Sequence, residues 1–377
     1  MTTYQPMAFT FTPAERVRGQ SPYQPGARAP WVDLVLDANE GPALRPEQLA
    51  ELPAIDADAV RQYPSTASLE QTIAERFGIN SARVIVTNGG DDAIDRACRA
   101  ALEPGRSALL HTPTFEMIPR GVRLNGADLI EIPWREGGFP KQAFLDAIAE
   151  HAPSMIALVT PNNPTGGVIP LRKILAIADA APSSLVLVDL AYIEFADDDP
   201  TPTLLERDNI MMVRTFSKAR GLAGLRVGYA VASEPVIRML RTTGGPYPVS
   251  PVSLAAASAA LDDDDRLDST VTRVRTERAE LASLLTQLGA QPLPTQANFV
   301  TADFSAVPAL CAAAVPAVPP AEVVRAALAQ RGIAVRGWPT RPDLAGLLRI
   351  TLPANETDFA RLAAALTEIL SPQETPS

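Results

Sequence analysis

Short apolar, β-branched runs alternate with helical segments along residues 49–232. Turn residues follow each run, and the apolar period of the next segment is helical at 68–78, 91–102 and 172–181. Parallel strands need long crossover connections, which are usually helices, and their sheets are covered on both faces. The alternation therefore predicts an α/β fold with a mostly parallel sheet between two layers of helices.

The pattern changes after about Pro251, where a long helical stretch rich in alanine and charge leads to strand-like runs separated by helices. This order predicts a smaller α+β domain. We expect an N-terminal arm over 1–45 that contributes to the small domain and to a dimer contact, a large domain over 46–255 and a small domain over 256–377. The proline-broken segment 306–322 is expected to be an inserted surface loop.

Composition argues against several classes of protein. The 377 residues carry a formal net charge of −10, which leaves no domain-wide basic surface for nucleic acid. Two cysteines and two histidines are too few for a disulfide framework or a Cys/His zinc cluster, so we expect no metal. No 18-residue apolar run and no signal peptide are found, so we expect a cytoplasmic protein without a membrane span.

Polar residues stand at the ends of the predicted strands, where open α/β sheets bind ligands. A glycine-rich turn at 87–92 opens a helix, whose N-terminus suits an anion. Asn163, Asp189 and the pair Ser217-Lys218 follow three further strands, and Arg226 comes shortly after. Taken singly, each is an ordinary turn, strand end or solvated charge. Together they predict one site at one sheet edge.

This arrangement resembles the pyridoxal-phosphate enzymes of the aspartate aminotransferase fold type (fold type I), and most of all histidinol-phosphate aminotransferase. The resemblance covers nearly the whole chain, and it implies the aspartate aminotransferase-like fold and pyridoxal 5′-phosphate as cofactor. The similar stretches are PYQPGAR, LDANEGP, QYP, TNGGDDAID, PTFEM, PNNPTG, AYIEF, RTFSKARGLAGLRVGY, PYPVS, NFV, AVRGW and LRITL.

The resemblance implies a role for each strand-end residue. Lys218 would condense with the cofactor aldehyde and move the proton on the substrate carbon. Asp189 would keep the pyridine nitrogen protonated, so that the ring can accept electrons. Asn163 and Tyr192 would hydrogen-bond the phenolic oxygen, and Phe115 would stack on the ring.

The resemblance also implies which residues hold the anionic groups. The cofactor phosphate would be bound by Gly90 and Asp91 through backbone N–H groups, and by Ser217 and Arg226. Tyr63 would reach the phosphate of a neighbouring subunit, which implies a homodimer. Arg349 would take the substrate's anionic group, with Arg336 and Tyr23 completing that pocket. The apolar, strand-like flanks of both arginines favour inward placement.

Three positions depart from the family pattern. Leu190 stands where an acid is usual, Phe115 where tyrosine is common, and Arg220 where relatives often carry an apolar or aromatic residue. None of these changes removes a group that the chemistry requires.

The implied activity is ping-pong transamination between histidinol phosphate and 2-oxoglutarate, with a small-molecule amino donor and keto acceptor, in histidine biosynthesis. Two enzymatic alternatives stay open: transamination of aromatic or other amino acids, and a lyase such as a phosphothreonine decarboxylase. The shape of the pocket decides which substrate bond is broken, and the sequence does not reveal it. A cofactor-binding scaffold without catalysis is disfavoured, because no catalytic group is missing.

Overall fold

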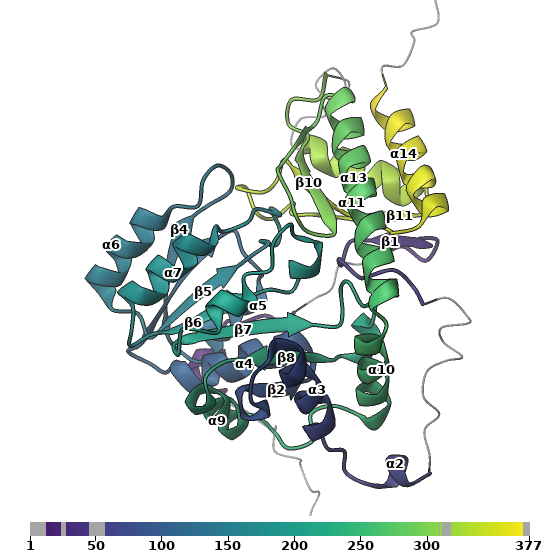
Figure 1. Cartoon of the computed structure of the whole chain (residues 1–377). Helices are drawn as coiled ribbons and strands as arrows, with labels where there is room; N and C mark the ends of the chain where they lie inside the picture. The colour runs from purple at the N-terminus through teal and green to yellow at the C-terminus, as the bar shows by residue number, and fades with distance from the viewer. Residues whose placement is uncertain (1–12, 24–27, 45–56, 309, 311–317, 372–377) are drawn as a thin grey trace, which may run out of the picture.

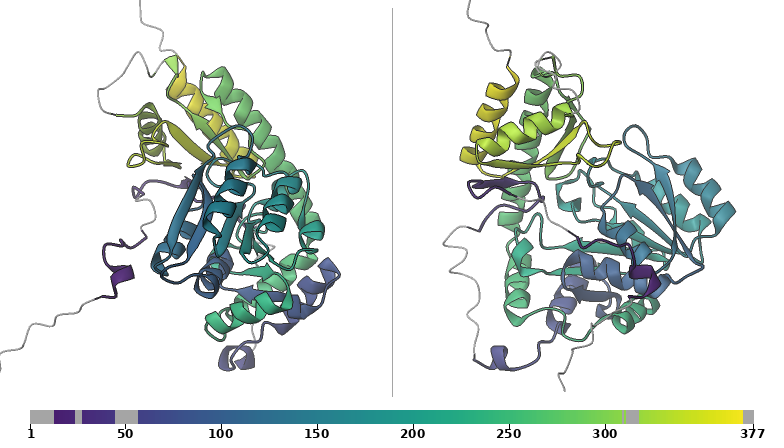
Figure 2. Two further views of the ribbon diagram at one scale, coloured as in Figure 1. Left: turned by 90° about the vertical axis from the view of Figure 1, so that its left-hand side faces the viewer. Right: turned by 180° about the vertical axis from the view of Figure 1, so that it is seen from behind.

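The computed structural model describes residues 13–23, 28–44, 57–308, 310 and 318–371, and these form two sheets. The larger sheet has seven strands in the order β2-β8-β7-β6-β5-β3-β4, and the smaller has five in the order β1-β11-β12-β10-β9. Figures 1 and 2 show the smaller sheet and its helices gathered at one end of the molecule, above the edge of the larger sheet.

The larger sheet confirms the predicted mostly parallel arrangement. Among the described strands of this sheet, only β8 runs antiparallel to its two neighbours. The central strands β5 to β7 are almost wholly buried, as expected for continuous apolar runs between two layers. The strands are β2 (Val84–Thr87), β3 (Ser107–Thr112), β4 (Asp128–Pro133), β5 (Met155–Val159), β6 (Leu185–Asp189), β7 (Ile210–Thr215) and β8 (Gly228–Val231).

Helices cover both faces of this sheet. On β5, Ile156 and Leu158 belong to one apolar core and Met155 and Val159 to another, because successive side chains point to opposite faces. The first core is closed by α3 (Ala67–Phe77), α6 (Lys141–His151), α7 (Leu171–Ala180) and α10 (Pro251–Asp262). The second is closed by α4 (Gly89–Ala101), α5 (Met117–Leu124) and α9 (Glu234–Thr243).

The smaller sheet joins the two ends of the described chain. Its first strand pairs in parallel with β11, so that Leu34 lies opposite Ile333. Its strands are β1 (Leu34–Leu36), β9 (Gln291–Pro292), β10 (Phe299–Asp303), β11 (Ile333–Gly337) and β12 (Leu347–Thr351). A third core packs this sheet against α11 (Asp264–Gln287), α13 (Pro320–Gln330) and α14 (Glu356–Leu370).

The predicted domain boundaries stay predictions. The predicted boundary at residue 255 lies inside α10, whose Ala256, Ala257, Ala260 and Leu261 pack in the core of the larger sheet. The predicted loop at 306–322 lies partly outside the described residues, and α13 begins within it at Pro320.

The remaining described elements are short: α2 (Ala57–Arg61), α8 (Thr201–Leu204), and the 3-10 turns η1 (Glu15–Val17), η2 (Ser81–Arg83), η3 (Ile193–Phe195) and η4 (Ala223–Leu225). None of the described helices is long and apolar enough to cross a membrane.

Candidate active site

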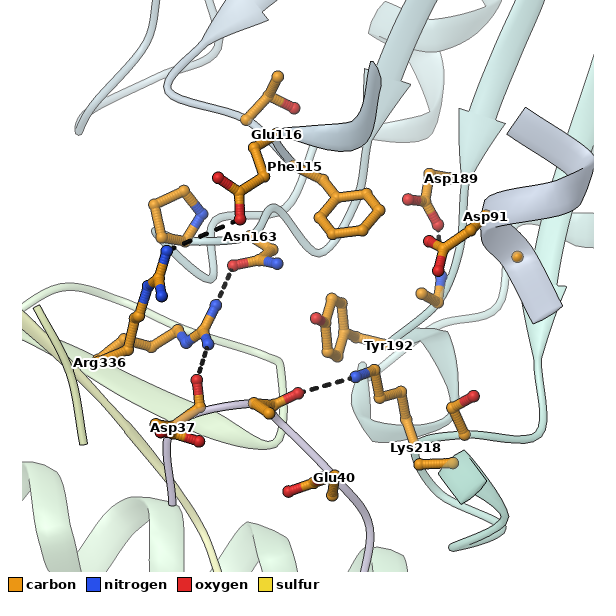
Figure 3. A pocket seen from close by; sticks show the side chains of 18 of the residues that line it. Asp37, Glu40, Asp91, Phe115, Glu116, Asn163, Asp189, Tyr192, Lys218 and Arg336 are labelled. Carbon is orange, nitrogen blue, oxygen red and sulfur yellow. Dashed lines mark hydrogen bonds and ion pairs between the residues drawn. The ribbon is translucent and has the colours of Figure 1, made fainter. Parts of the chain in front are cut away.

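A cavity of about 580 Å³ lies between the carboxyl ends of the larger sheet's strands and the smaller sheet. Figure 3 shows its side chains converging from both sheets and from the segment after β1. The residues of the predicted site that line it are Tyr23, Gly90, Asp91, Phe115, Asn163, Asp189, Tyr192, Ser217, Lys218, Arg226, Arg336 and Arg349. The one predicted site residue outside this lining is Tyr63.

Lys218 stands in the turn after β7 and points into the cavity (Figure 3). Its Nζ donates to the carbonyl oxygen of Ala38 at 3.2 Å and lies 5.7 Å from the centre of the Tyr192 ring. Burial lowers the pKa of the amine to about 8, because the charged form loses hydration. About a tenth of the amine is therefore neutral at pH 7, and this neutral form is the one that a nucleophile or proton carrier requires.

Asp189 ends β6 with its carboxylate buried at the floor of the cavity. Its one hydrogen bond within the described chain comes from the N–H of Ala191, at 3.0 Å from Oδ1. Burial raises the pKa of the carboxyl to about 6. A buried carboxylate with so few partners is suited to a cationic ligand group, such as a protonated pyridine nitrogen.

The N-terminus of α4 and Arg226 form a cradle for an anion. Gly90 and Asp91 lie in the first turn of α4, where backbone N–H groups lack helical partners. Arg226 Nη2 donates to the Asp91 carboxylate at 2.9 Å, and a Cβ added at Gly89 would stand only 2.7 Å from the same Nη2. The Ser217 hydroxyl, 2.9 Å from that of Thr215, completes a set of donors that fits a phosphate.

Asn163 and Tyr192 bring polar atoms to the middle of the cavity. Asn163 lies in the turn after β5, and its Oδ1 accepts from Arg349. Tyr192 is buried at the start of η3, and its hydroxyl accepts from Asn39 Nδ2 at 3.0 Å. Phe115 lies across the cavity from Tyr192, with an aromatic face for a planar ring (Figure 3).

Arg349 is a buried cation without a carboxylate partner in the described chain. It donates to the Asn163 side chain and, at 2.6 Å, to the carbonyl oxygen of Asp37. Its guanidinium lies 5.4 Å from the centre of the Phe299 ring and 6.0 Å from a Trp338 ring centre. Burial lowers its pKa to about 10, so it stays charged at neutral pH and can receive an anion.

Arg336 lies opposite Arg349 in the register of β11 and β12, so two cations project from neighbouring strands. The Arg336 guanidinium is 3.7 Å from the Glu116 carboxylate. Tyr23, from the N-terminal segment, is half exposed at the cavity wall. Burial, and then the charge of Glu116, raise the pKa of its phenol.

Tyr63 does not reach the cavity of its own chain. Its side chain is 81% exposed and stacks on Tyr247, with ring centres 4.4 Å apart. Its predicted role in a neighbouring subunit's site remains a prediction.

Several lining residues were missed by sequence reasoning, among them Asp37, Glu40, Glu116, Trp338 and Arg341. Asn39 was missed as well, although it holds the hydroxyl of Tyr192. All of them except Arg341 lie in the family-like stretches LDANEGP, PTFEM and AVRGW, so the similarity of these stretches to the family was the sequence signal that could have identified them.

Two of the three departures from the family pattern, Leu190 and Arg220, have local explanations. Leu190 is fully buried in the larger sheet's core, where an acid would lack a partner. Arg220 points away from the cavity and donates to the carbonyl oxygens of Ala260 and Asp263, so it ties the lysine-bearing turn to α10.

The donor set as a whole fits pyridoxal 5′-phosphate. A buried carboxylate faces the place for a ring nitrogen, an aromatic ring and a tyrosine flank the cavity, and a helix N-terminus with an arginine suits the phosphate. Lys218 is in reach of the same space (Figure 3).

Comparisons with known proteins agree with this assignment. A family model described as aminotransferase class I and II matches residues 34–366. A histidinol-phosphate aminotransferase of Geobacillus sp. (strain WCH70) is 33% identical, over 95% of this chain and 98% of that protein.

Two solved structures show the same fold. The histidinol-phosphate aminotransferase of Sinorhizobium meliloti, solved with pyridoxal-5′-phosphate, has a TM-score of 0.79 at 27% identity and covers 90% of this chain and 91% of that one. A Thermus thermophilus aspartate aminotransferase mutant has a TM-score of 0.73 at 23% identity and covers 95% and 99%. The predicted aspartate aminotransferase-like fold is therefore confirmed, and the chain belongs to the class I and II aminotransferase family.

Proposed function

We propose that this protein is a pyridoxal-phosphate-dependent aminotransferase that transfers the amino group of histidinol phosphate to 2-oxoglutarate, in histidine biosynthesis. The observation that carries the proposal is that one cavity holds both the amine of Lys218 and the buried guanidinium of Arg349, which has no carboxylate partner among the described residues. The substrate assignment is supported by relatives of that name at about 33% identity over most of the chain.

The cofactor supplies an aldehyde that takes up the amino group and a ring that stabilises negative charge on the substrate carbon. Asp189 would keep the ring nitrogen protonated, because the positive charge of the protonated nitrogen stabilises the buried carboxylate, which loses hydration in the protein. Tyr192 and Asn163 bind the phenolic oxygen from the middle of the cavity. Gly90, Ser217 and Arg226 bind the phosphate.

Lys218 would remove the proton from the substrate carbon and would return it to the carbon of the former cofactor aldehyde. The lowered pKa of its amine favours this role, since a general base works best with a pKa near the working pH. Its position beside the Tyr192 ring and under the carbonyl of Ala38 limits the directions from which Nζ can approach a substrate.

Arg349 binds the anionic group that each substrate carries on the same side of the reacting carbon. The phosphate monoester of histidinol phosphate and the carboxylate next to the keto carbon of 2-oxoglutarate can each accept two N–H donors from a guanidinium. Arg336, on the neighbouring strand, adds a second cation for the larger charge of the phosphate. One site can therefore accept the two partners of a ping-pong cycle in turn.

The active form in this proposal is a homodimer. Tyr63 and Tyr247 form an exposed aromatic pair outside their own cavity, and such a surface is suited to a second copy of the chain. Tyr63 then reaches the cofactor phosphate of the partner. The cytoplasmic location predicted from the sequence belongs to the same proposal.

Absorbance of the purified holoenzyme tests the substrate. L-histidinol phosphate and L-glutamate should each convert the visible band of the bound cofactor to that of its amine form, and 2-oxoglutarate should restore it. A band that responds to glutamate and aromatic amino acids but not to histidinol phosphate would refute the substrate. Carbon dioxide release from phosphothreonine without a keto acid would instead support the lyase.

Mixed dimers test the role of Tyr63. Two variants, Lys218→Ala and Tyr63→Ala, are expected to be weakly active alone, but a dimer of one with the other contains one complete site. Mixing them should therefore restore activity. Absence of restoration in mixtures shown to contain the hybrid dimer would contradict a role for Tyr63 in the partner's site.

A further inference from the structure

The carboxylate of Glu116 has no part in the chemistry described so far. It projects into the end of the cavity opposite Lys218 (Figure 3). It also lines a second cavity of about 400 Å³, which shares Tyr23, Thr114 and Arg341 with the first. Glu116 therefore stands where the active-site cavity continues beyond the residues that bind cofactor and phosphate.

This carboxylate is weakly engaged. Within the described residues its one ion pair is with Arg336, at 3.7 Å, and no hydrogen bond reaches its oxygens. Its side chain is 53% exposed. The neighbouring Arg341 is held by Asp343 in a two-pronged pair of 2.9 and 2.6 Å, so it has a better partner than Glu116.

Binding of an anionic substrate group changes the charges around Glu116. A phosphate bound by Arg336 and Arg349 would pair with the Arg336 guanidinium, which lies 3.7 Å from Glu116 when no ligand is bound. Glu116 is then left beside a second negative group, which is unfavourable unless a positive or N–H-bearing group comes with the substrate. An imidazole ring, with an ordinary pKa of about 6.5, supplies an N–H and takes a positive charge readily beside two anions.

We propose that Glu116 forms a subsite for the substrate's side chain, and that it accepts a hydrogen bond from an N–H-bearing, protonatable ring on a substrate whose phosphate is bound by Arg336 and Arg349. This inference rests on the proposed function and names the feature by which the enzyme distinguishes histidinol phosphate from carbocyclic amines. The second cavity receives the far edge of the ring. There Glu131 lies near Arg341, and Arg120 is tied to the carbonyl oxygen of Ser21 at 2.7 Å.

The test compares two amines that differ only in the ring. The rate of conversion of the cofactor band is measured with L-histidinol phosphate and with L-phenylalaninol phosphate, for the wild-type holoenzyme and for Glu116→Gln. A hydrogen bond to a charged acceptor is worth roughly a tenfold to hundredfold preference. Glu116→Gln should lower the ratio of the two kcat/KM values by about this factor. Any change in phosphate binding caused by freeing Arg336 cancels in the ratio.

Glu136→Gln is the matched control, because Glu136 is an exposed carboxylate that lines neither of the two cavities. It should leave the ratio unchanged, and the melting temperature of each variant should report folding. An unchanged ratio in Glu116→Gln, or equal losses with both amines, would overturn the inference while leaving the proposed function intact. If wild-type enzyme reacts with glutamate but not with histidinol phosphate, the proposed substrate and the inference both fail.

Discussion

Replacing Asp189 by asparagine should stabilise the cofactor-free protein while impairing the enzyme. Burial raises the pKa of this carboxyl to about 6 in the folded chain, against an ordinary value of 3.8. Because the folded state binds the proton more tightly, this group costs stability as the pH rises from below 3.8, and the cost levels off above pH 6. Asparagine keeps an acceptor for the N–H of Ala191 and carries no charge.

The size of the stabilisation follows from the difference between the folded and unfolded pKa values of Asp189. This difference lowers the free energy of unfolding of the wild type by about 3 kcal/mol at pH 8, and by about half of that at pH 5, where the folded carboxyl is largely protonated. A chain of 377 residues unfolds with an entropy near 0.8 kcal/mol/K, at about 2.1 cal/mol/K per residue. Asp189→Asn should therefore raise the melting temperature of the cofactor-free protein by about 4 °C at pH 8 and by about 2 °C at pH 5.

Thermal melts of wild type and variant, without and with cofactor, measure this directly. Added pyridoxal 5′-phosphate should stabilise the wild type more than the variant. The negative charge of Asp189 destabilises the cofactor-free protein, but it is favourable beside the protonated ring nitrogen of the cofactor. A variant no more stable than wild type at pH 8, or one equally stabilised at pH 5 and pH 8, would refute the claim that the buried charge of Asp189 destabilises the cofactor-free protein.

Three further outcomes are expected. Lys218→Ala should lower kcat for transamination by at least about a thousandfold, and turnover at the wild-type rate would contradict its role. Arg349→Lys loses the two-pronged contact and should raise KM for histidinol phosphate by about tenfold to hundredfold with a smaller change in kcat, whereas a pure kcat effect would argue against substrate binding. The rate of cofactor capture by the cofactor-free protein should rise about tenfold per pH unit up to about pH 8 and then level off, because burial lowers the pKa of Lys218 to about 8; a flat profile would disagree.

The part of the site that could be predicted lies at the ends of the strands. Asp189 ends β6, and Asn163 and Lys218 follow β5 and β7, which are the neighbours of β6 in the larger sheet. Parallel strands bring their carboxyl ends to one edge, so the order of residues along the chain already implied their proximity in space. The fold class followed from the same alternation of strands and helices.

The part that could not be predicted depends on pairing between distant segments. Asp37 reaches the cavity and Asn39 reaches Tyr192 because β1 pairs with β11, about 300 residues away, and no local sequence pattern predicts this pairing. The positive φ of Asn39, 55°, directs its amide to Tyr192, and turn conformations of this kind are weakly encoded in sequence. Glu116 was missed because an exposed acid before a helix is an ordinary surface feature.

The pairing of the arginines around the cavity explains how an acidic protein selects anions. Arg28 and Arg341 are held by two-pronged contacts with Asp37 and Asp343, and their charges are largely neutralised. Arg226 has a single close contact with Asp91, and Arg336 has a longer contact of 3.7 Å with Glu116. Arg349 has no carboxylate partner in the described chain. The attraction for an incoming anion should therefore increase from Arg226 to Arg336 to Arg349. The strongest uncompensated positive charge is therefore that of Arg349, which is buried in β12 of the smaller sheet, where the substrate's anion is proposed to bind. It attracts an anion locally even though the whole chain carries a net charge of −10.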